Sequence, residues 1–338
     1  MRSVLILWGL APFGCAPARE ADLSRFSYTQ IHMGVETRVV LYATDEPAAR
    51  SGAAAAFARI ARLDAVMSDY RQDSELNRLS ESPPGRWVPL SDDLFRVLEL
   101  SQGFSERTAG AFDCTVGPLT RIWREARRSG ELPRAEDLAA ARAAVGWRLL
   151  ELDSATRSAR LGAGGMRLDL GGIGKGFAAQ EASMVLRGLG LTRHMVALAG
   201  DVTAAAPPPG EPGWRVVVES GYGAGPRPVI WLADRSVSTS GDAEQFIDFG
   251  GVRYSHILDP RTGLGLTSRA AATVVAPDGA AADALASAAC VLGPEAARAA
   301  FGGAPGLGVR MVVDGAEHRF GPASGLIREL DAPERSKP

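Results

Sequence analysis

Cysteine is scarce in this sequence: Cys15, Cys114 and Cys290 are the only three in 338 residues. None of them belongs to a CxxC pair or to a group of histidines and cysteines, so the spacing typical of a structural zinc site is lacking. Cys290 lies in the apolar segment ALASAACVLG, which favours a buried thiol. The alternative is a disulfide between Cys290 and Cys114.

Positive charge is not in excess either. The chain has 37 lysines and arginines against 39 aspartates and glutamates, a net charge of −2. A basic patch interleaved with aromatic residues is lacking, so no nucleic-acid partner is expected. A hydrophobic content of 46% with 22% charged residues is typical of a globular protein, and the length suits one large domain or two ordinary ones.

The apolar run at the N-terminus, residues 4–13, is too short to cross a membrane as a helix. Arg2 precedes it and Gly14-Cys15-Ala16 follows it, which is the order of an export signal. A cysteine directly after glycine predicts a bacterial lipoprotein. Residues 1–15 would then be the signal and 16–24 a tether, with lipid on Cys15 holding the protein at the periplasmic face of the inner membrane. An ordinary cleaved signal and a buried N-terminal strand are the alternatives.

Hydrophobic periodicity predicts an α+β fold. Strands and helices intermix without strict βαβ alternation, which favours two lobes within one folded region, residues 25–325, followed by a tail, 326–338. The segment 109–119 is expected to be irregular. The expected strands are around Met33-Gly34 within 26–43, a hairpin at 149–161, strands at 194–198, 214–219, 229–232, 236–239, 254–258 and 270–276, and a closing hairpin at 309–320. The expected helices are 46–67, one capped by Ser91 and running to 106, 134–145, 177–189 and 280–291.

The most informative segment is DLGGIGKGFAAQEA, residues 169–182. The apolar run 166–170 predicts a strand, which breaks into a glycine-rich turn containing Lys175, and a helix is expected from Phe177. Backbone N–H groups, a helix N-terminus and a lysine together suit a phosphate. The spacing does not match the nucleotide-binding pattern G-x-x-x-x-G-K-[ST], so a tight turn without a ligand is the alternative.

Three further segments place polar side chains where packing alone would not need them. Tyr70 lies in a polar turn, Asp113 lies in an apolar loop, and His256 lies in a predicted strand. Each also has a purely structural interpretation. Asp113 would cap a helix starting near Val116, His256 would be a satisfied structural histidine, and the acidic residues around Tyr70 would be a solvated face.

Asp283 and Ser287 are spaced i, i+4 in the apolar helix AADALASAACVL and therefore share one face. A buried aspartate is costly unless it is paired or holds a cation. A carboxylate, a hydroxyl and a backbone carbonyl form an oxygen set that suits Mg²⁺. The alternative is an aspartate near a helix N-terminus that is stabilised by the helix dipole.

Taken together, these segments resemble the FAD:protein FMN transferase family, the ApbE-type flavin transferases. The similar blocks run in order from Met33 to about Gly293, which is most of the mature chain. They are MSDYRQDSELNRL, GAFDCTVGPL, DLGGIGKGFAAQ, ALAGDV, STSGDAEQF, YSHILDPRTG and ADALASAACVLG. Ser287 stands where the family has threonine, which keeps the hydroxyl.

The resemblance implies two lobes with an FAD-binding cleft between them. It also implies a Mg²⁺-dependent enzyme that cleaves FAD, attaches FMN through a phosphoester to a threonine of an acceptor flavoprotein, and releases AMP. The implied FAD contacts are Met33, Tyr70, Ala111, Phe112, Asp113, Asp169, Lys175, His256 and Ile257. The implied metal contacts are the Gly172 carbonyl, Asp283 and Ser287.

The residues implied to act in the reaction are His256, Lys175 and Asp283. Lys175 and Mg²⁺ would neutralise charge on the pyrophosphate, and either His256 or a nearby aspartate would take the threonine proton. Two other functions stay open. One is an FAD pyrophosphatase, in which water replaces the threonine, and the other is a non-catalytic FAD-binding lipoprotein.

Overall fold

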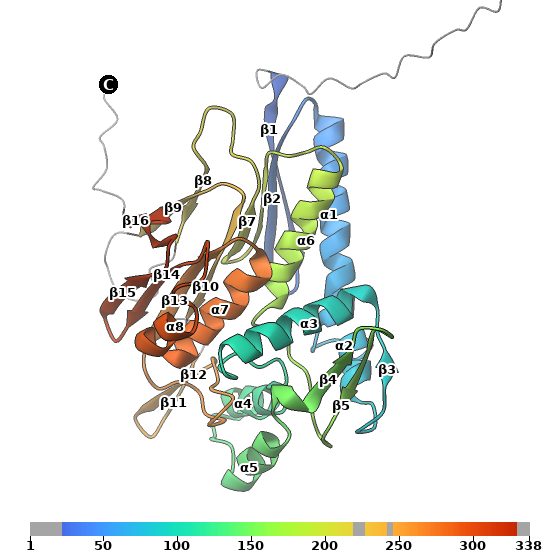
Figure 1. Ribbon diagram of the computed structural model, residues 1–338, viewed down its shortest axis with the longest axis vertical. Helices are drawn as coiled ribbons and strands as arrows, with labels where there is room; N and C mark the ends of the chain where they lie inside the picture. The colour runs from blue at the N-terminus through green and yellow to red at the C-terminus, as the bar shows by residue number, and fades with distance from the viewer. Residues whose placement is uncertain (1–21, 219–226, 242–245, 330–338) are drawn as a thin grey trace, which may run out of the picture.

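The computed structural model describes residues 22–218, 227–241 and 246–329. Its centre is an eight-stranded sheet with the order β1-β2-β6-β7-β10-β13-β14-β15 (Figure 1). The first hairpin, β1 (Ser24–His32) and β2 (Val35–Ala43), turns at Met33 and Gly34, whose φ angles are 50° and 73°. Positive φ at both residues gives a turn whose twist matches antiparallel strands, and the strands predicted on either side of it are confirmed.

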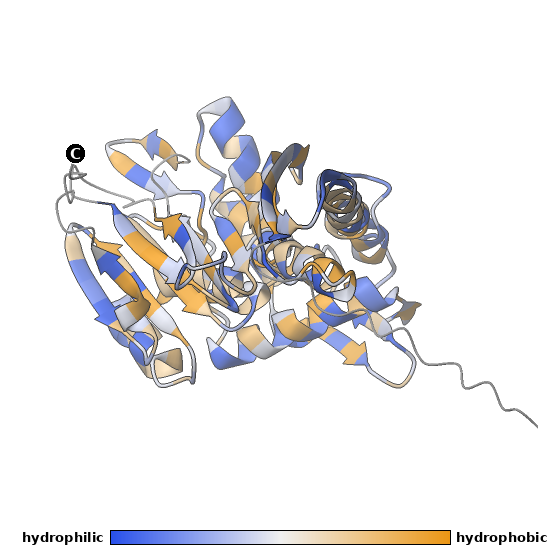
Figure 2. Cartoon of the chain, turned by 90° about the horizontal axis from the view of Figure 1, so that it is seen from above, coloured by the Kyte–Doolittle hydropathy of each residue, from blue (hydrophilic) through white to orange (hydrophobic). Residues whose placement is uncertain are grey.

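All neighbouring strands of this sheet run antiparallel. The other six strands are β6 (His194–Leu198), β7 (Asp201–Ala204), β10 (Arg235–Gly241), β13 (Ala270–Ala276), β14 (Gly308–Val313) and β15 (Ala316–Phe320). Apolar and polar residues alternate along several strands, as Figure 2 shows, because successive side chains point to opposite faces.

The two faces of the sheet pack against different cores. Val39 and Leu41 of β2 belong to the larger core, whereas Val40 between them belongs to a second core on the other face. Among the helices that contribute to the larger core are α1 (Glu46–Met67), α6 (Gly174–Gly188) and α7 (Gly279–Leu292). The second core lies under a small sheet of β16 (Ile327–Glu329), β9 (Pro228–Leu232) and β8 (Trp214–Val217).

The small sheet corrects one predicted boundary. The expected tail from residue 326 includes β16, and Ile327 of that strand is 1% exposed and pairs with Ile230 of β9. The folded part therefore extends to Glu329. The apolar side chain of Ile327 fills the second core, a contact that the short sequence of β16 does not reveal.

A second group of elements forms the lower part of the molecule in Figure 1. The α+β fold with two intermixed lobes is therefore confirmed, since the larger core continues from the sheet into Phe104 and Leu161 of this group. Its members are α2 (Glu75–Ser80), β3 (Val88–Pro89), α3 (Asp92–Arg107), α4 (Gly117–Ser129), α5 (Ala135–Ala143), β4 (Leu150–Asp153) and β5 (Ser158–Leu161). Strands β11 (Phe246–Phe249) and β12 (Val252–Ser255) form a separate antiparallel pair, and α8 (Pro294–Phe301) packs against α7.

Three local predictions are wrong. Residues 166–170 form no strand, because they pair only through an isolated bridge between Arg167 and Val116. Helix α6 begins at Gly174 rather than at Phe177, so Lys175 lies in its first turn. His256 does not lie in a strand, because β12 ends at Ser255 and the chain bends there.

Both cysteines in the described part of the chain, Cys114 and Cys290, are buried and not joined in a disulfide, which confirms the prediction for Cys290 and excludes the disulfide alternative. Within the described ranges, no helix combines the length and apolar character needed to span a membrane. The predicted signal and most of the predicted tether fall in residues 1–21, which lie outside the described residues.

Candidate functional site

Three charged side chains meet at the N-terminus of α6. The Lys175 Nζ atom lies 2.7 Å from Asp201 Oδ2 and 3.9 Å from Asp283 Oδ2. The backbone N–H of Gly176 donates a hydrogen bond of 3.0 Å to the same Asp283 oxygen. We call Lys175, Asp201 and Asp283 the central cluster. It joins α6, β7 and α7, which are far apart in the sequence.

Close helix packing sets this geometry. A Cβ on Gly176 would lie 2.1 Å from the Gly279 carbonyl oxygen, and a Cβ on Gly279 would lie equally close to the Gly176 carbonyl oxygen. Only glycine fits at both positions, and this brings α7 against the first turn of α6. Asp201 is held separately, because its carboxylate accepts a hydrogen bond from the hydroxyl of Ser238 on β10.

The central cluster has two carboxyl groups and one ammonium group in a buried place. Burial and the neighbouring Asp201 raise the pKa of Asp283 to about 7, although Lys175 and two backbone N–H groups oppose this change. Burial alone would lower the pKa of Lys175, but the carboxylates of Asp283 and Asp201 raise it above its ordinary value. Lys175 therefore stays charged, and one negative charge has no balancing cation within the cluster.

The predicted metal contacts lie beside this cluster. The hydroxyls of Ser287 and Ser240 are 3.1 Å apart. The Gly172 backbone approaches Ser287 closely, because a Cβ on Gly172 would lie 3.3 Å from Ser287 Oγ. The oxygens of Asp283, Ser287 and Gly172 are the hard ligands that Mg²⁺ prefers, and the missing positive charge fits a divalent cation. In the described segments, no group of three or more histidines, cysteines and acidic residues forms a metal cluster.

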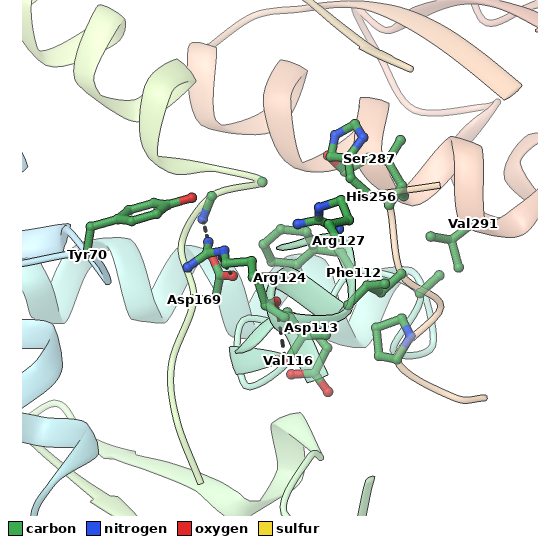
Figure 3. A pocket seen from close by; sticks show the side chains of 17 residues that line it. Tyr70, Phe112, Asp113, Val116, Arg124, Arg127, Asp169, His256, Ser287 and Val291 are labelled. Carbon is green, nitrogen blue, oxygen red and sulfur yellow. Dashed lines mark hydrogen bonds and ion pairs between the residues drawn. The ribbon is translucent and has the colours of Figure 1, made fainter. Parts of the chain in front are cut away.

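One cavity, of about 240 Å³, opens beside Gly172 and Ser287 (Figure 3). It contains most of the predicted FAD contacts together with Arg124 and Arg127 of α4, which the sequence analysis did not predict. The predicted FAD contacts with polar or aromatic side chains in its lining are Tyr70, Phe112, Asp113, Asp169 and His256. The other two predicted contacts in the lining are Ala111 and Ile257.

Arg124 organises one wall of this cavity. Its guanidinium forms an ion pair with Asp69, lies 3.6 Å from Asp169 Oδ2, and stacks 4.2 Å from the centre of the Tyr70 ring. Asp69 therefore supports Arg124 through this ion pair and does not belong to a solvated face, because its side chain is 19% exposed. Arg127 lines the same cavity, and burial together with the nearby Arg124 lowers its pKa. Arg124 and Arg127 are spaced i, i+3 just after the buried Trp123, and this helical spacing could have indicated α4 and the side of it that faces the cavity.

Asp113 has a structural role that differs from the predicted cap. Its carboxylate accepts hydrogen bonds from the Thr115 N–H at 2.8 Å, the Thr115 hydroxyl at 2.7 Å and the Trp147 N–H at 2.9 Å. Helix α4 starts at Gly117 without a side-chain cap. Asp113 therefore fixes the loop that presents Ala111 and Phe112, and burial raises its pKa despite these hydrogen bonds.

A second cavity, of about 650 Å³, adjoins the first. The two share Gly171, His256, Ile257 and Ser287, so these residues stand at their junction. All three residues of the central cluster line the second cavity. Met33 is the one predicted contact that is absent from the described lining of both cavities. Its methyl group instead lies 3.6 Å from the Cβ position of Gly174.

Comparison with known proteins identifies the class to which this fold and site belong. The ApbE family profile matches residues 33–309, most of the chain. A FAD:protein FMN transferase of Treponema pallidum (strain Nichols) is 30% identical over 361 residues, covering 98% of both chains. One of Haemophilus influenzae is 31% identical over 245 residues, covering 70% of both.

Solved structures of ApbE proteins have the same fold as this chain. The apo form of the flavinyl transferase ApbE from Pseudomonas stutzeri superposes with a TM-score of 0.80 at 29% identity, covering 92% of this chain and 98% of that one. The ApbE protein of Thermotoga maritima superposes with a TM-score of 0.81 at 27% identity, covering 90% and 100%. The chain belongs to the ApbE family, as its sequence motifs predict.

Proposed function

We propose that this protein is a Mg²⁺-dependent FAD:protein FMN transferase that attaches FMN to a threonine of an acceptor flavoprotein. The observation that carries the proposal is the central cluster, which has one positive charge for two carboxyl groups and lines the second cavity next to its junction with the first. One cavity suits a part of FAD and the other leaves room for a second substrate. The family membership and the printed activity of the relatives support this function.

Asp283, Ser287 and the Gly172 carbonyl would hold the Mg²⁺ ion. Bound there, the ion would neutralise the negative charge of the FAD pyrophosphate. Lys175 supplies a fixed positive charge to the same phosphates, and the N-terminus of the 15-residue helix α6 points its backbone N–H groups into the same region. A cation bound here would thus balance both the carboxyl groups of the central cluster and the pyrophosphate of FAD.

The transfer breaks the phosphoanhydride bond of FAD and forms a phosphoester with the threonine. The threonine hydroxyl oxygen forms a bond to the phosphorus of the FMN half, and the bond from that phosphorus to the oxygen of the AMP phosphate breaks. His256, which lines both cavities, would accept the threonine proton, and Asp201, which lines the second cavity, is the aspartate that would do so in its place. AMP leaves with the bridging oxygen.

A single assay tests this function. The protein is incubated with FAD, MgCl₂ and a purified candidate acceptor, and the acceptor is then weighed intact by mass spectrometry while AMP is quantified. A mass gain equal to FMN, with equal AMP release, is expected. Release of AMP without labelling would favour the pyrophosphatase, and bound FAD without either product would favour a storage protein.

We also propose that the protein is exported and anchored to the membrane through a lipid on Cys15. The support is the order of charged, apolar and small residues before Cys15. In a bacterial host, Cys15→Ala is expected to move the protein from the membrane fraction to the soluble fraction. An unchanged membrane association in this variant would contradict the anchor.

A further inference from the structure

Two inner strands of the eight-stranded sheet, β6 and β7, stop short of their neighbours beside the central cluster, which leaves a notch in the sheet. Strands β6 and β7 end at the turn formed by Ala199 and Gly200, whereas β2 and β10 on either side extend further. The pairing of β7 with β10 stops at Val202 and Val237, and β10 continues to Gly241. We call the space bounded by Val35, the β6–β7 turn and the end of β10 the notch.

The end of β10 presents backbone groups to the notch. On its other side, β10 pairs with β13 along its whole length, from Ser236 to Gly241. A Cβ on Gly200 would lie 3.7 Å from the Thr239 carbonyl oxygen, so this carbonyl faces the turn and not β13. In an antiparallel strand the N–H and C=O of one residue point to the same side. Thr239 and, two residues on, Gly241 therefore face the notch with their backbone groups.

The second cavity is the interior of this notch. Val216, Val217 and Val218, at the end of β8, form an apolar wall, and Lys175 and Asp283 lie on the opposite, helical side. Val217 is 41% exposed, so its side chain is accessible at this wall. A backbone edge, an apolar wall and a charged floor together match an extended peptide that adds to a strand and leaves its side chains in pockets.

We infer that the notch binds the acceptor protein through an extended segment that carries the target threonine and pairs with the end of β10. This inference rests on the proposed function, which requires a second protein substrate. The notch joins the first cavity at His256 and Ser287, so a threonine held there reaches the phosphorus that FAD presents from the other side. The flavin ring is the competing occupant, and the experiment below separates the two.

The test uses two substitutions in the notch, each with a matched control. Val217→Glu places a carboxylate on the apolar wall, and Val252→Glu makes the same change at an equally exposed strand residue, 41%, outside both cavities. Gly200→Val fills the space in front of the Thr239 carbonyl, and Gly303→Val adds the same side chain at an open surface position. Neither glycine has a positive φ angle, so a side chain brings no backbone strain.

The substrates are FAD and the flavoprotein that the wild-type enzyme labels in the assay above. We expect both notch variants to raise the KM for the acceptor by about tenfold or more, because a buried carboxylate or a blocked strand edge weakens its binding. The Kd for FAD, measured by flavin fluorescence, should stay within about twofold, and both controls should match the wild type. An unchanged acceptor KM, or a weaker FAD affinity in its place, would overturn the inference.

A peptide experiment tests the strand pairing itself and needs no variant to fold. Short synthetic peptides centred on the labelled threonine are made with one backbone N–H at a time replaced by N-methyl. We expect loss of labelling at alternate positions only, because every second residue of an added strand bonds to its neighbour. Equal tolerance at all positions would refute strand addition. If the wild type labels no acceptor, the proposed function fails before these experiments begin.

Discussion

Helix α6 takes part in two buried ion clusters that differ in their charge balance. Near its middle, Glu181 pairs with Arg59 of α1 and lies 2.7 Å from Arg96 of α3. Arg59 also binds both oxygens of Asp93, at 2.5 and 2.6 Å. In this balanced cluster Glu181 and Asp93 are matched by Arg59 and Arg96, and three helices are tied together. The exposed Arg62 adds a longer contact, 3.8 Å, to Asp93 at the rim of the cluster.

The central cluster at the start of the same helix has two acidic groups and one basic group. A buried carboxylate without a balancing cation does not stabilise a protein, because burial removes the hydration of the charge and no ion pair compensates for that loss. The balanced cluster lines neither cavity, whereas the central cluster lines the second cavity. The difference indicates that the balanced cluster serves the fold and that the central cluster is kept for a ligand.

The largest effect should follow from breaking the central cluster. Asp283→Asn removes the unbalanced charge and the proposed metal ligand, so transfer should fall by about 1,000-fold, equivalent to about 4 kcal/mol. The melting temperature without Mg²⁺ should not fall, because the repulsion with Asp201 is relieved. Initial rates and thermal unfolding measure both. The control is Asp234→Asn, which removes a carboxylate from a surface ion pair with Arg187 of α6. Full activity of Asp283→Asn would disprove the metal assignment.

Breaking the balanced cluster should have the opposite signature. Arg59→Met leaves Glu181 buried without its main partner and should lower the free energy of unfolding by about 3 to 5 kcal/mol. The activity of the remaining folded protein should stay near the wild-type value. Urea unfolding gives the first quantity and the rate per folded molecule the second. Arg50→Met, in the same helix but at a surface ion pair with Glu46 and with a side chain 67% exposed, should change little. A loss of activity without a loss of stability would reverse the two roles.

A neutral contact on α6 predicts how stability depends on pH. The His194 ring nitrogen Nε2 lies 2.7 Å from the Ser183 hydroxyl, and burial lowers the pKa of His194 to about 4. Between pH 6.5 and 4 the unfolded chain binds a proton at His194 that the folded chain does not. Stability from this residue is therefore complete above pH 6.5 and falls by about 3 kcal/mol as the pH drops to 4.

The measurement is the free energy of unfolding at a series of pH values for the wild type and for His194→Gln. The variant keeps a polar partner for Ser183 and should lack this part of the pH dependence. Identical pH profiles for the two proteins would show that His194 does not titrate as its burial requires.

The smallest effect should come from the hydroxyl of Ser287. Ser287→Ala removes one oxygen beside Asp283 and should lower activity at limiting Mg²⁺ by about tenfold, with partial recovery at high Mg²⁺. Ser287→Thr keeps the hydroxyl and should stay within about threefold of the wild type. The Mg²⁺ dependence of the rate decides between them. Equal Mg²⁺ dependence in all three proteins would remove Ser287 from the metal site.

Much of the fold follows from local patterns. The bounds of α1, residues 46–67, match the prediction, and Ser91 caps α3 as expected, with its hydroxyl accepting the Leu94 N–H. Periodicity and caps depend on residues that are neighbours along the chain, so they can be predicted from the sequence. A helix starting near Val116 is expected only as the structural alternative for Asp113, and α4 begins there at Gly117 without the expected side-chain cap.

The candidate site divides in the same way. The sequence by itself determined the chemical groups, namely a lysine in a glycine-rich turn and an aspartate and a serine one helical turn apart. Only the tertiary structure decided that Asp201 pairs with Lys175, that Arg124 stacks on Tyr70, and that β7 stops short of the end of β10. These contacts join segments far apart in the chain, and their positions depend on how the helices and the sheet pack, which no local pattern records.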